Sequence, residues 1–525
     1  MEIQEELDIM NLTMTEVFEQ TCKRFPERNA VCFYGQELNY QTLFGYASRF
    51  AAGLSEAGIQ KGDRVAIMLP NCPQYVIAYY GVLMAGGIVV QVNPMSVERE
   101  IEHYLSDSGA KAMVAYGPLL PRIAGAPSSA NLVKKVVVEL PPANNTYEDG
   151  SVGFEAFLAG ASSPAPQVTL SPEDLAVLQY TGGTTGRSKG AMLTHRNLVV
   201  NAYQSFMLTG NNGEPERMLT VIPLFHVYAM TVAMNAAIYS GSQLILLPRF
   251  DLEEVLQTIK ETKPTIFPGV PTMYIALNSH PKAQEYGISA IRLCLSGSAP
   301  MPVEAMREFE EKTQGTIMEG YGLSEASPVT HFNPIEKRKP GSIGTPILFT
   351  KAKIVDLGDG TTELPPNEVG ELVIRGPQVM AGYWNMPEET AETIRDGWLY
   401  TGDIGRMDEE GYFYIIDRKK DMILASGYNV YPRDVEEVLY QHPAVQEAVV
   451  VGVPDSYRGE TVKAFIVVKQ GATLSEEEII SFCREKLAAY KVPRLIEFRS
   501  ELPKTAVGKI LRRTLRDEAR KEAVN

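Results

Sequence analysis

The sequence YTGGTTGRSKG, residues 180–190, contains four glycines, three threonines and two cationic residues. Glycine lets the backbone form turns closed to other residues and lets its N–H groups approach a ligand closely. The threonine hydroxyls and the Lys189 ammonium supply the hydrogen-bond donors and positive charge that a phosphate group requires. The composition therefore indicates a phosphate-binding loop, although an exposed turn rich in breaker residues has the same composition.

Two well-known loop motifs can be compared with this stretch. A Walker-type loop requires G-x-x-x-x-G-K-[ST], but Ser188 stands where the second glycine belongs and Gly190 where the hydroxyl belongs. Residues 186–190, GRSKG, do match the G-x-S-x-G motif of serine hydrolases. That motif places its serine at a sharp strand-to-helix turn, whereas Ser188 lies eight positions after Tyr180. A serine hydrolase is therefore a minor alternative.

The composition is that of a soluble globular protein with more than one domain. The chain has 525 residues, of which 45% are hydrophobic and 22% charged, and this length exceeds that of one ordinary core. The net charge of −15 argues against nucleic acid as the main partner, because phosphate backbones are bound by basic surfaces. A locally basic site for a phosphorylated ligand is still compatible with that charge.

Neither the cysteines nor the chain's N-terminus point to secretion. The five cysteines are scattered without a C-x-x-C pair, and the six histidines form no metal-ligand pattern. This usage fits a reducing cytoplasm. The first residues are acidic and lack a signal pattern, and the apolar stretch 227–239 predicts a buried helix rather than a membrane span. We expect a cytoplasmic protein, and peripheral contact with the inner face of the membrane stays open.

Helix and strand patterns alternate through the first 350 residues or so. Residues 40–57 place their apolar side chains on one helical face, and 64–71 then read as a buried strand. Such alternation is typical of parallel α/β sheets. The segment 140–170, rich in Pro, Gly, Ser and Asn, is predicted to be a surface connection rather than part of the core.

From about Thr350 the pattern changes to short strands punctuated by turns. The stretches KAKIVD (351–356), GELVIRG (370–376), GYFYIID (411–417) and KDMILASG (420–427) predict a mostly antiparallel subdomain. A compact α+β unit follows, and the charged run 417–421 marks the boundary between domains 1–417 and 418–525. The predicted fold class is α/β, with a large N-terminal domain of α/β sheets that includes the antiparallel β subdomain, and a small α+β C-terminal domain.

Several stretches together resemble the adenylate-forming enzymes, which include acyl-CoA synthetases, luciferases and peptide-synthetase adenylation domains. The stretches are ELNYQTL (37–43), VLMAGGIVVQVNP (82–94), YTGGTTGRSKG (180–190), PLFH (223–226), SGSAP (296–300), EGYGLSE (319–325), GELVIRGPQVMAGYW (370–384), YTGD (400–403), IIDRKKDMILASGYNVYPRDVEE (415–437), YKVP (490–493) and LPKTAVGKILRR (502–513). Their order and spacing extend over nearly the whole chain, which displaces the hydrolase hypothesis. Residues 396–420 look most like the fatty-acid-activating branch of bacterial acyl-CoA synthetases.

The resemblance implies a fatty acid–CoA ligase with two half-reactions. Fatty acid and ATP would give acyl-AMP and pyrophosphate, and coenzyme A would then give acyl-CoA and AMP. Mg²⁺, a hard cation suited to a carboxylate and phosphate oxygens, is the expected metal, with Glu325 as a ligand and Thr184 as a second candidate. The residues expected to bind ATP or AMP are Thr181, Gly182, Gly183, Thr184, Thr185, Gly186, Lys189, Gly297, Ser298, Ala299, Pro300, Glu319, Gly320, Tyr321, Gly322, Ser324, Asp403, Arg418 and Lys509.

The resemblance also implies individual roles. Tyr321 is expected to stack on adenine, while Asp403 and Arg418 reach the ribose. Lys509 is the expected catalytic lysine, bridging the acyl carboxylate and the α-phosphate, with Glu325 and His226 as further catalytic candidates. Without the resemblance, Lys509 would be taken for a solvated charge in a basic tail.

The second half-reaction implies a hinge between the two domains, at Lys420. Rotation about it would withdraw Lys509 and bring the coenzyme A-binding residues Ser426, Gly427 and Tyr428 to the site. Gly427 would leave room for the pantetheine arm.

The sequence identifies the residues of the acyl pocket less clearly than those of the nucleotide site. His226 would gate the acyl carbonyl, and Val227 stands where some long-chain enzymes carry an aromatic gate. Val227, Met230 and Met234 either line an acyl tunnel or belong to the core of a buried helix, and the sequence does not choose between these.

Three alternatives and one further question remain at this point. An aryl-CoA ligase or a fatty acyl-AMP ligase would share the fold and change the acid or the acceptor. A nucleotide-binding regulator without catalysis is a different class, disfavoured because a mere binder has no need of Lys509. Some relatives form homodimers, and nothing in this chain indicates whether it does.

Overall fold

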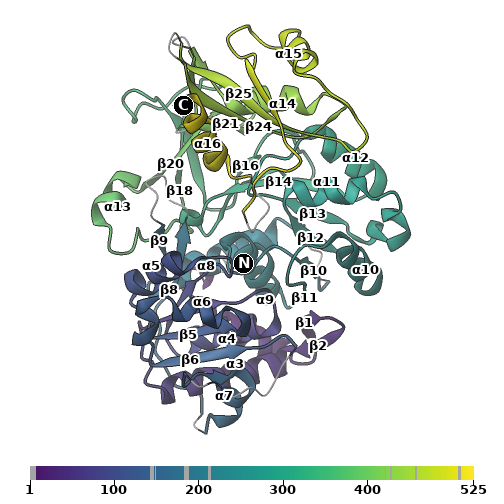
Figure 1. Cartoon of the computed structure of the whole chain (residues 1–525). Helices are drawn as coiled ribbons and strands as arrows, with labels where there is room; N and C mark the ends of the chain where they lie inside the picture. Colours follow the sequence, from purple (N-terminus) through teal and green to yellow (C-terminus); the bar gives the residue numbers. More distant parts are fainter. Residues whose placement is uncertain are drawn as a thin grey trace.

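The computed structural model describes residues 8–141, 147, 149–162, 164–181, 188–210, 214–419, 421–425, 428–455, 458–505 and 510–524. Figure 1 shows an N-terminal body of two mainly parallel sheets at the bottom and centre, an antiparallel sheet at the upper left, and a C-terminal domain at the top.

The first sheet of the N-terminal body has seven strands. Their order is β7 (Val152–Gly153), β6 (Lys134–Val138), β5 (Ala112–Tyr116), β3 (Arg64–Met68), β4 (Ile88–Gln91), β8 (Leu175–Thr181) and β9 (Lys189–Thr194). Neighbouring strands are parallel except β8 and β9, which form an antiparallel hairpin. The helices of this part are α3 (Tyr40–Glu56), α4 (Pro73–Met84), α5 (Glu98–Ser108), α6 (Leu120–Ala124) and α7 (Phe154–Gly160). Because helices cover the sheet, strands such as β4 are buried along their whole length.

The second sheet has nine strands, parallel in its centre and antiparallel at its edges. Their order is β16 (Thr345–Pro346), β15 (Val329–Phe332), β14 (Thr316–Gly322), β13 (Leu293–Ser296), β12 (Ile266–Gly269), β10 (Arg217–Thr220), β11 (Gln243–Leu246), β1 (Asn29–Phe33) and β2 (Gln36–Asn39). The helices here are α2 (Met14–Arg24), α8 (His195–Met207), the π-helix η3 (Ala229–Asn235), α9 (Ala236–Ser240), α10 (Leu252–Thr262), α11 (Pro271–Ser279) and α12 (Val303–Thr313).

The two sheets share one apolar core, in which α4 is buried on every side. The hydroxyl of Tyr80 donates to Asn235 Oδ1 at 3.0 Å, and Asn235 Nδ2 donates to the hydroxyl of Tyr79 at 3.3 Å. These bonds satisfy polar groups that would otherwise destabilise the core.

The remaining strands form two antiparallel arrays. The β subdomain contains β17 (Lys351–Val355), β18 (Gly370–Arg375), β19 (Ile394–Arg395), β20 (Trp398–Met407) and β21 (Phe413–Arg418), with helix α13 (Pro387–Thr393). The C-terminal domain contains β22 (Ile423–Ala425), β23 (Tyr428–Val430), β24 (Val445–Asp455), β25 (Gly459–Val468) and β26 (Leu495–Phe498), with α14 (Pro432–Tyr440), α15 (Glu476–Arg484) and α16 (Arg512–Val524). Among the described strands of that domain, β26 runs parallel to its neighbour β25 and the other pairs are antiparallel.

The predicted fold class is confirmed, with two corrections. The segment 140–170 is not only a surface connection, because α7 buries Phe154, Phe157 and Leu158 in the main core. The strand predicted within 420–427 does not belong to the β subdomain, since β22 pairs with β25 in the C-terminal sheet.

Separate apolar clusters lie on either side of the predicted domain boundary. One contains Phe413 of the β subdomain, and two others begin at Ile423 and Val449 in the C-terminal part. The division into 1–417 and 418–525 stays a prediction.

In the described ranges, none of the helices has both the length and the apolar character needed to cross a bilayer.

Helix α8 generates a prediction about acid stability. Its first residue, His195, is 1% exposed, and its Nδ1 accepts a hydrogen bond from the backbone N–H of Met14 at 3.2 Å. Burial lowers the pKa of His195 from 6.5 to about 4. Between these values the unfolded chain binds a proton that the folded chain does not, so stability falls as the pH falls from 6.5 towards 4.

We expect this histidine alone to lower the free energy of unfolding by about 1.4 kcal/mol per pH unit in that window. His195→Asn keeps an acceptor near the Nδ1 position but cannot titrate, so its stability should depend less steeply on pH. Denaturant unfolding of both proteins between pH 7 and pH 5 measures the two slopes. Equal slopes would contradict the assignment.

Candidate active site

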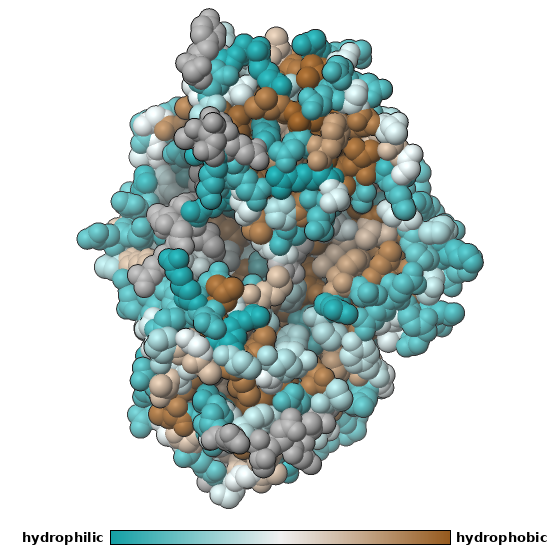
Figure 2. Space-filling model, in the orientation of Figure 1, coloured by the Kyte–Doolittle hydropathy of each residue, from teal (hydrophilic) through white to brown (hydrophobic). Residues whose placement is uncertain are grey.

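The predicted nucleotide-site residues that the structure describes come from the β8–β9 hairpin, from β14 and the segments that follow β13 and β14, and from the β subdomain. The candidate acyl-pocket residues lie in and just before η3, and Tyr428 begins β23. Figure 2 shows the molecular surface hollowed across the middle of one face, between the N-terminal body and the C-terminal domain. Nine predicted residues lie outside the described part: Gly182, Gly183, Thr184, Thr185, Gly186, Lys420, Ser426, Gly427 and Lys509.

The hairpin places Thr181 and Lys189 opposite each other, at the last residue of β8 and the first of β9. Ser188 thus precedes a strand and does not sit at a strand-to-helix turn, which removes the structural basis of the hydrolase hypothesis. The Lys189 ammonium forms an ion pair with Glu389 of α13, and its side chain is 14% exposed.

Tyr383 lies between Lys189 and Glu325. Glu325 belongs to the short 3₁₀ helix η6 (Ser324–Ala326), which follows β14, and its Oε1 accepts a hydrogen bond from the Tyr383 hydroxyl at 2.7 Å. The Lys189 ammonium stands 5.2 Å from the centroid of the Tyr383 ring. Burial, and then the Glu325 charge, raise the pKa of Tyr383, so its hydroxyl stays a donor at neutral pH. The predicted phosphate-binding cation and the predicted metal ligand therefore meet at one tyrosine.

Sequence reasoning missed Tyr383 and Glu389 as site residues. Tyr383 belongs to a stretch that carried the family resemblance, but no pattern links it to Glu325. Glu389 is 200 positions from Lys189, so no local spacing signals their contact. Glu388 and Glu389 lie in the first turn of α13, where acidic residues are favoured, but this local preference says nothing about a contact with Lys189.

Three residues predicted to bind the nucleoside gather at the edge of the β subdomain. The β20–β21 pairing aligns Asp403 with Arg418, and the Arg418 Nε lies 3.5 Å from Asp403 Oδ1. The other oxygen, Asp403 Oδ2, accepts a hydrogen bond from the Tyr321 hydroxyl. The carboxylate that would accept hydrogen bonds from the ribose hydroxyls is thereby held between the Tyr321 hydroxyl and the Arg418 guanidinium.

The SGSAP stretch follows β13 and has an unusual backbone. Ser298 has a φ of +67°, a left-handed conformation that is uncommon outside glycine and is often associated with functional sites. A Cβ on Gly297 would make an ordinary van der Waals contact with the ring of Tyr228 at 3.4 Å, so that ring borders this position. Ala299 and Pro300 complete the connection to Met301.

Glu319 of β14 holds the end of the SGSAP stretch by hydrogen bonds to the backbone. Its side chain accepts hydrogen bonds from the backbone N–H of Met301 at 3.1 Å and of Gly341 at 3.2 Å. Burial raises the pKa of Glu319, while the Arg433 charge and these two bonds oppose the shift. Glu319 thus holds the loop in place, and Gly320, Tyr321 and Gly322 continue along β14 towards Ser324.

The candidate acyl-pocket residues are part of the closed core in this structure. Val227 is 2% exposed, and Met230 and Met234, both in η3, are fully buried. Gln91 Nε2 contacts Met230 Sδ at 3.2 Å. His226 is half-buried, and its Nδ1 accepts from the backbone N–H of Tyr228 at 3.3 Å. Since π-helices often occur at functional sites, η3 fits either a core helix or the wall of a tunnel that opens by repacking.

The described residues contain no group of three or more His, Cys, Asp or Glu side chains placed to hold a metal ion among themselves. Mg²⁺ needs no such cage, because it commonly uses one or two carboxylates together with phosphate oxygens and water. Glu325, the carboxylate predicted to bind the metal, accepts a hydrogen bond from Tyr383, the residue whose ring also contacts Lys189.

Comparisons with known proteins find matches over almost the whole chain. A family model described as AMP-binding enzyme matches residues 18–384, and one described as AMP-binding enzyme C-terminal domain matches residues 434–509. The long-chain-fatty-acid–CoA ligase of Bacillus subtilis (strain 168) is 50% identical over 543 residues, covering 98% of this chain and 96% of that protein. The protein of the same name from Escherichia coli O6:H1 is 42% identical over 542 residues, with the same coverage of both chains.

Solved structures match the fold of the whole chain at lower identity. The anthranilate CoA ligase AuaEII, crystallised in complex with anthranoyl-AMP, superposes with a TM-score of 0.90 at 30% identity. The superposition covers 98% of this chain and 99% of that one.

The Lys189–Glu389 ion pair generates a prediction about anion binding. A triphosphate that binds Lys189 must displace Glu389, so Glu389→Gln should strengthen MgATP binding, by up to about fivefold for a partly exposed pair. Isothermal titration calorimetry measures the dissociation constant. Glu388→Gln is the matched control, because it removes the same charge from the exposed side of α13. Equal effects of the two variants would show that general charge, and not this contact, is responsible.

Proposed function

Because the chain belongs to the AMP-binding enzyme family, we propose that it is an ATP-dependent fatty acid–CoA ligase acting on medium- or long-chain acids. It forms acyl-AMP and pyrophosphate from the acid and ATP, and then acyl-CoA and AMP from the adenylate and coenzyme A. The observation that carries the proposal is the meeting of Lys189 and Glu325 at Tyr383. The names of the two bacterial relatives support the choice of a fatty acid.

The phosphate side of the site neutralises charge. The carboxylate of the acid and the α-phosphate of ATP are both negative, so their approach requires nearby cations. Lys189 exchanges Glu389 for the β- and γ-phosphates, and the Ser324 hydroxyl lies next to Glu325 to bond the α-phosphate. Mg²⁺, when bound at Glu325, supplies further positive charge to the phosphate oxygens.

The nucleoside side of the site orients ATP. Tyr321 packs against adenine while its hydroxyl holds Asp403, and Asp403 accepts from the ribose hydroxyls. Arg418 is already paired with Asp403, so it reaches the ribose without a large movement. This pre-organisation reduces the entropy cost of fixing the nucleotide.

The division into domains 1–417 and 418–525, with the hinge at Lys420, belongs to the same proposal. It is supported by the separate apolar clusters and by the two family models, which end and begin on opposite sides of residue 420. Lys509 acts in adenylation, and Ser426, Gly427 and Tyr428 act in thioester formation after rotation. Tyr428 is 57% exposed and stacks on Tyr490 at 4.7 Å, which leaves its outer side accessible to a ligand.

An aryl-CoA ligase is the second candidate, because the solved structure with the TM-score of 0.90 is an anthranilate CoA ligase. A coupled assay of AMP release, with and without coenzyme A, across saturated acids of increasing length and a set of aromatic acids separates the candidates. We expect coenzyme A-dependent turnover with long saturated acids. Turnover confined to aromatic acids, or release of AMP that does not depend on coenzyme A, would reject the proposal.

Lys509→Ala should lower adenylate formation by about a hundredfold or more. The substitution removes the cation that would stabilise the negative charge shared by the acyl carboxylate and the α-phosphate in the transition state. Pyrophosphate exchange measures this step, and thioester formation from pre-made acyl-adenylate should persist. Lys504→Ala is the control within the same basic tail, since Lys504 is paired with Glu447 at 2.6 Å. Unchanged exchange in Lys509→Ala would refute the assignment.

Gly427→Leu should block thioester formation and leave adenylation largely intact, because the side chain would fill the path of the pantetheine arm. Pyrophosphate exchange and acyl-CoA formation are measured on the same preparation. If both half-reactions fall equally, Gly427 has another role.

A further inference from the structure

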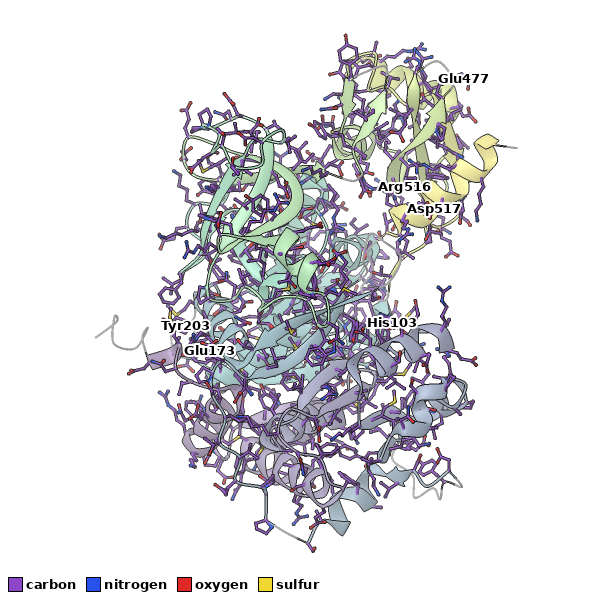
Figure 3. The ribbon with its side chains drawn as sticks, turned by 90° about the vertical axis from the view of Figure 1, so that its left-hand side faces the viewer. His103, Glu173, Tyr203, Glu477, Arg516 and Asp517 are labelled. Carbon is purple, nitrogen blue, oxygen red and sulfur yellow. The ribbon has the colours of Figure 1, made fainter. Side chains whose placement is uncertain are left out.

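We propose that His103 and Asp107 of α5 are positioning residues for ATP binding, which hold the two strand ends of the β8–β9 hairpin in register with Tyr383. This inference rests on the proposed function, because it concerns the site that would bind ATP. Figure 3 shows His103 on the side of the N-terminal body that lies towards the C-terminal domain, where Arg516 and Asp517 are labelled.

One turn of α5 contacts both strands of the hairpin. His103 Nε2 lies 2.8 Å from the backbone oxygen of Ser188, and because a carbonyl only accepts, Nε2 carries the proton and donates. One turn later, Asp107 Oδ2 accepts a hydrogen bond from the Tyr180 hydroxyl at 2.6 Å. Residues four positions apart share a helix face, so a single face of α5 meets the end of β8 and the start of β9.

Aromatic packing reinforces these hydrogen bonds. The Tyr180 ring lies 4.9 Å from that of Tyr104 and 5.8 Å from that of His103, which it meets edge-on. On the hairpin, a Cβ at Gly190 would lie 3.3 Å from the Tyr180 ring and 3.5 Å from Trp384. The hairpin is therefore packed between α5 and the segment that carries Trp384.

Asp107 also connects α5 to that segment. Its backbone oxygen accepts hydrogen bonds from Trp384 Nε1 at 3.0 Å and from Asn385 Nδ2 at 3.3 Å. Tyr383, the neighbour of Trp384, contacts both Glu325 and Lys189. The same helical turn thus fixes the hairpin and the tyrosine at which the phosphate and metal residues meet.

These contacts differ from those that hold α5 itself. The helix is buried through Ile101, Tyr104, Leu105 and Ser108, whereas His103 and Asp107 are half-buried and reach the hairpin. Ser188 and Tyr180, which these two side chains hold, are the neighbours of Lys189 and Thr181, two of the residues proposed to bind ATP. Holding these neighbours in the binding geometry before ATP arrives reduces the entropy cost of binding, so the loss of His103 should weaken ATP binding more than it weakens the fold.

The test compares His103→Ala with His103→Gln. Alanine removes the donor to Ser188 and should weaken MgATP binding by about tenfold, whereas the glutamine amide can donate from a similar position and should stay within about threefold of wild type. Isothermal titration calorimetry gives the dissociation constant, and steady-state kinetics give KM for ATP and for the acid. We expect KM for ATP to rise while KM for the acid and the melting temperature stay near wild type.

Ser106→Ala is the matched control, because Ser106 bonds only to backbone oxygens within α5 among its described contacts and should leave ATP binding unchanged. Should His103→Ala fold poorly, Tyr180→Phe removes the hydroxyl that Asp107 holds and should weaken MgATP binding by about threefold. Unchanged ATP binding in His103→Ala, no advantage of glutamine over alanine, or equal rises in both KM values would overturn the proposal. Calorimetry needs no acid, so wild-type protein that binds MgATP but makes no acyl-CoA would refute the proposed function and still test these residues.

Discussion

The site depends on backbone pairing between β9 and the segment 380–384. The N–H of Met192 donates to the oxygen of Gly382, and the N–H groups of Ala381 and Trp384 donate to the oxygens of Met192 and Gly190, all at 2.8–2.9 Å. On the other side, the N–H of Met380 donates to the backbone oxygen of Glu325 at 2.8 Å. One extended segment thus places Tyr383 between the first residue of β9 and the helix that follows β14. Without this segment Tyr383 would not link Lys189 to Glu325, because Lys189 begins β9 of the first sheet and Glu325 lies in η6, which follows β14 of the second sheet.

The general architecture was predictable from sequence because it depends on local periodicity. Alternating helix and strand patterns indicated parallel sheets, and the change near Thr350 indicated an antiparallel one. The two errors have physical causes. In segment 140–170, Pro, Gly, Ser and Asn are frequent, yet Phe154, Phe157 and Leu158 follow helical spacing and suffice to bury α7. The local sequence pattern predicts that β22 is a strand, but it does not predict which sheet the strand joins. That depends on its pairing with β25, and pairing partners are set by the whole chain.

The residues of the candidate site could be predicted only from the resemblance to a known family, in which the same residue types occur in the same order. The sequence named Lys189, Glu325, Tyr321, Asp403 and Arg418, and the structure brings the first two to Tyr383 and the other three together at the edge of the β subdomain. It did not reveal Glu389, Tyr383 or His103, because each acts through a contact between distant parts of the chain. Such contacts leave no spacing in the sequence that periodicity could detect.

The pairing of Glu389 with Lys189 has a consequence for turnover. A tethered carboxylate competes for the ammonium at a fixed effective concentration, whatever the level of nucleotide in the surroundings. If Lys189 binds phosphate as proposed, Glu389 weakens the binding of substrate and product polyphosphates alike, and it can return to Lys189 as pyrophosphate leaves. In an enzyme that activates an acid, pyrophosphate must leave before the thiol attacks. The ion pair would therefore speed the release of pyrophosphate and, at the same time, weaken the binding of ATP.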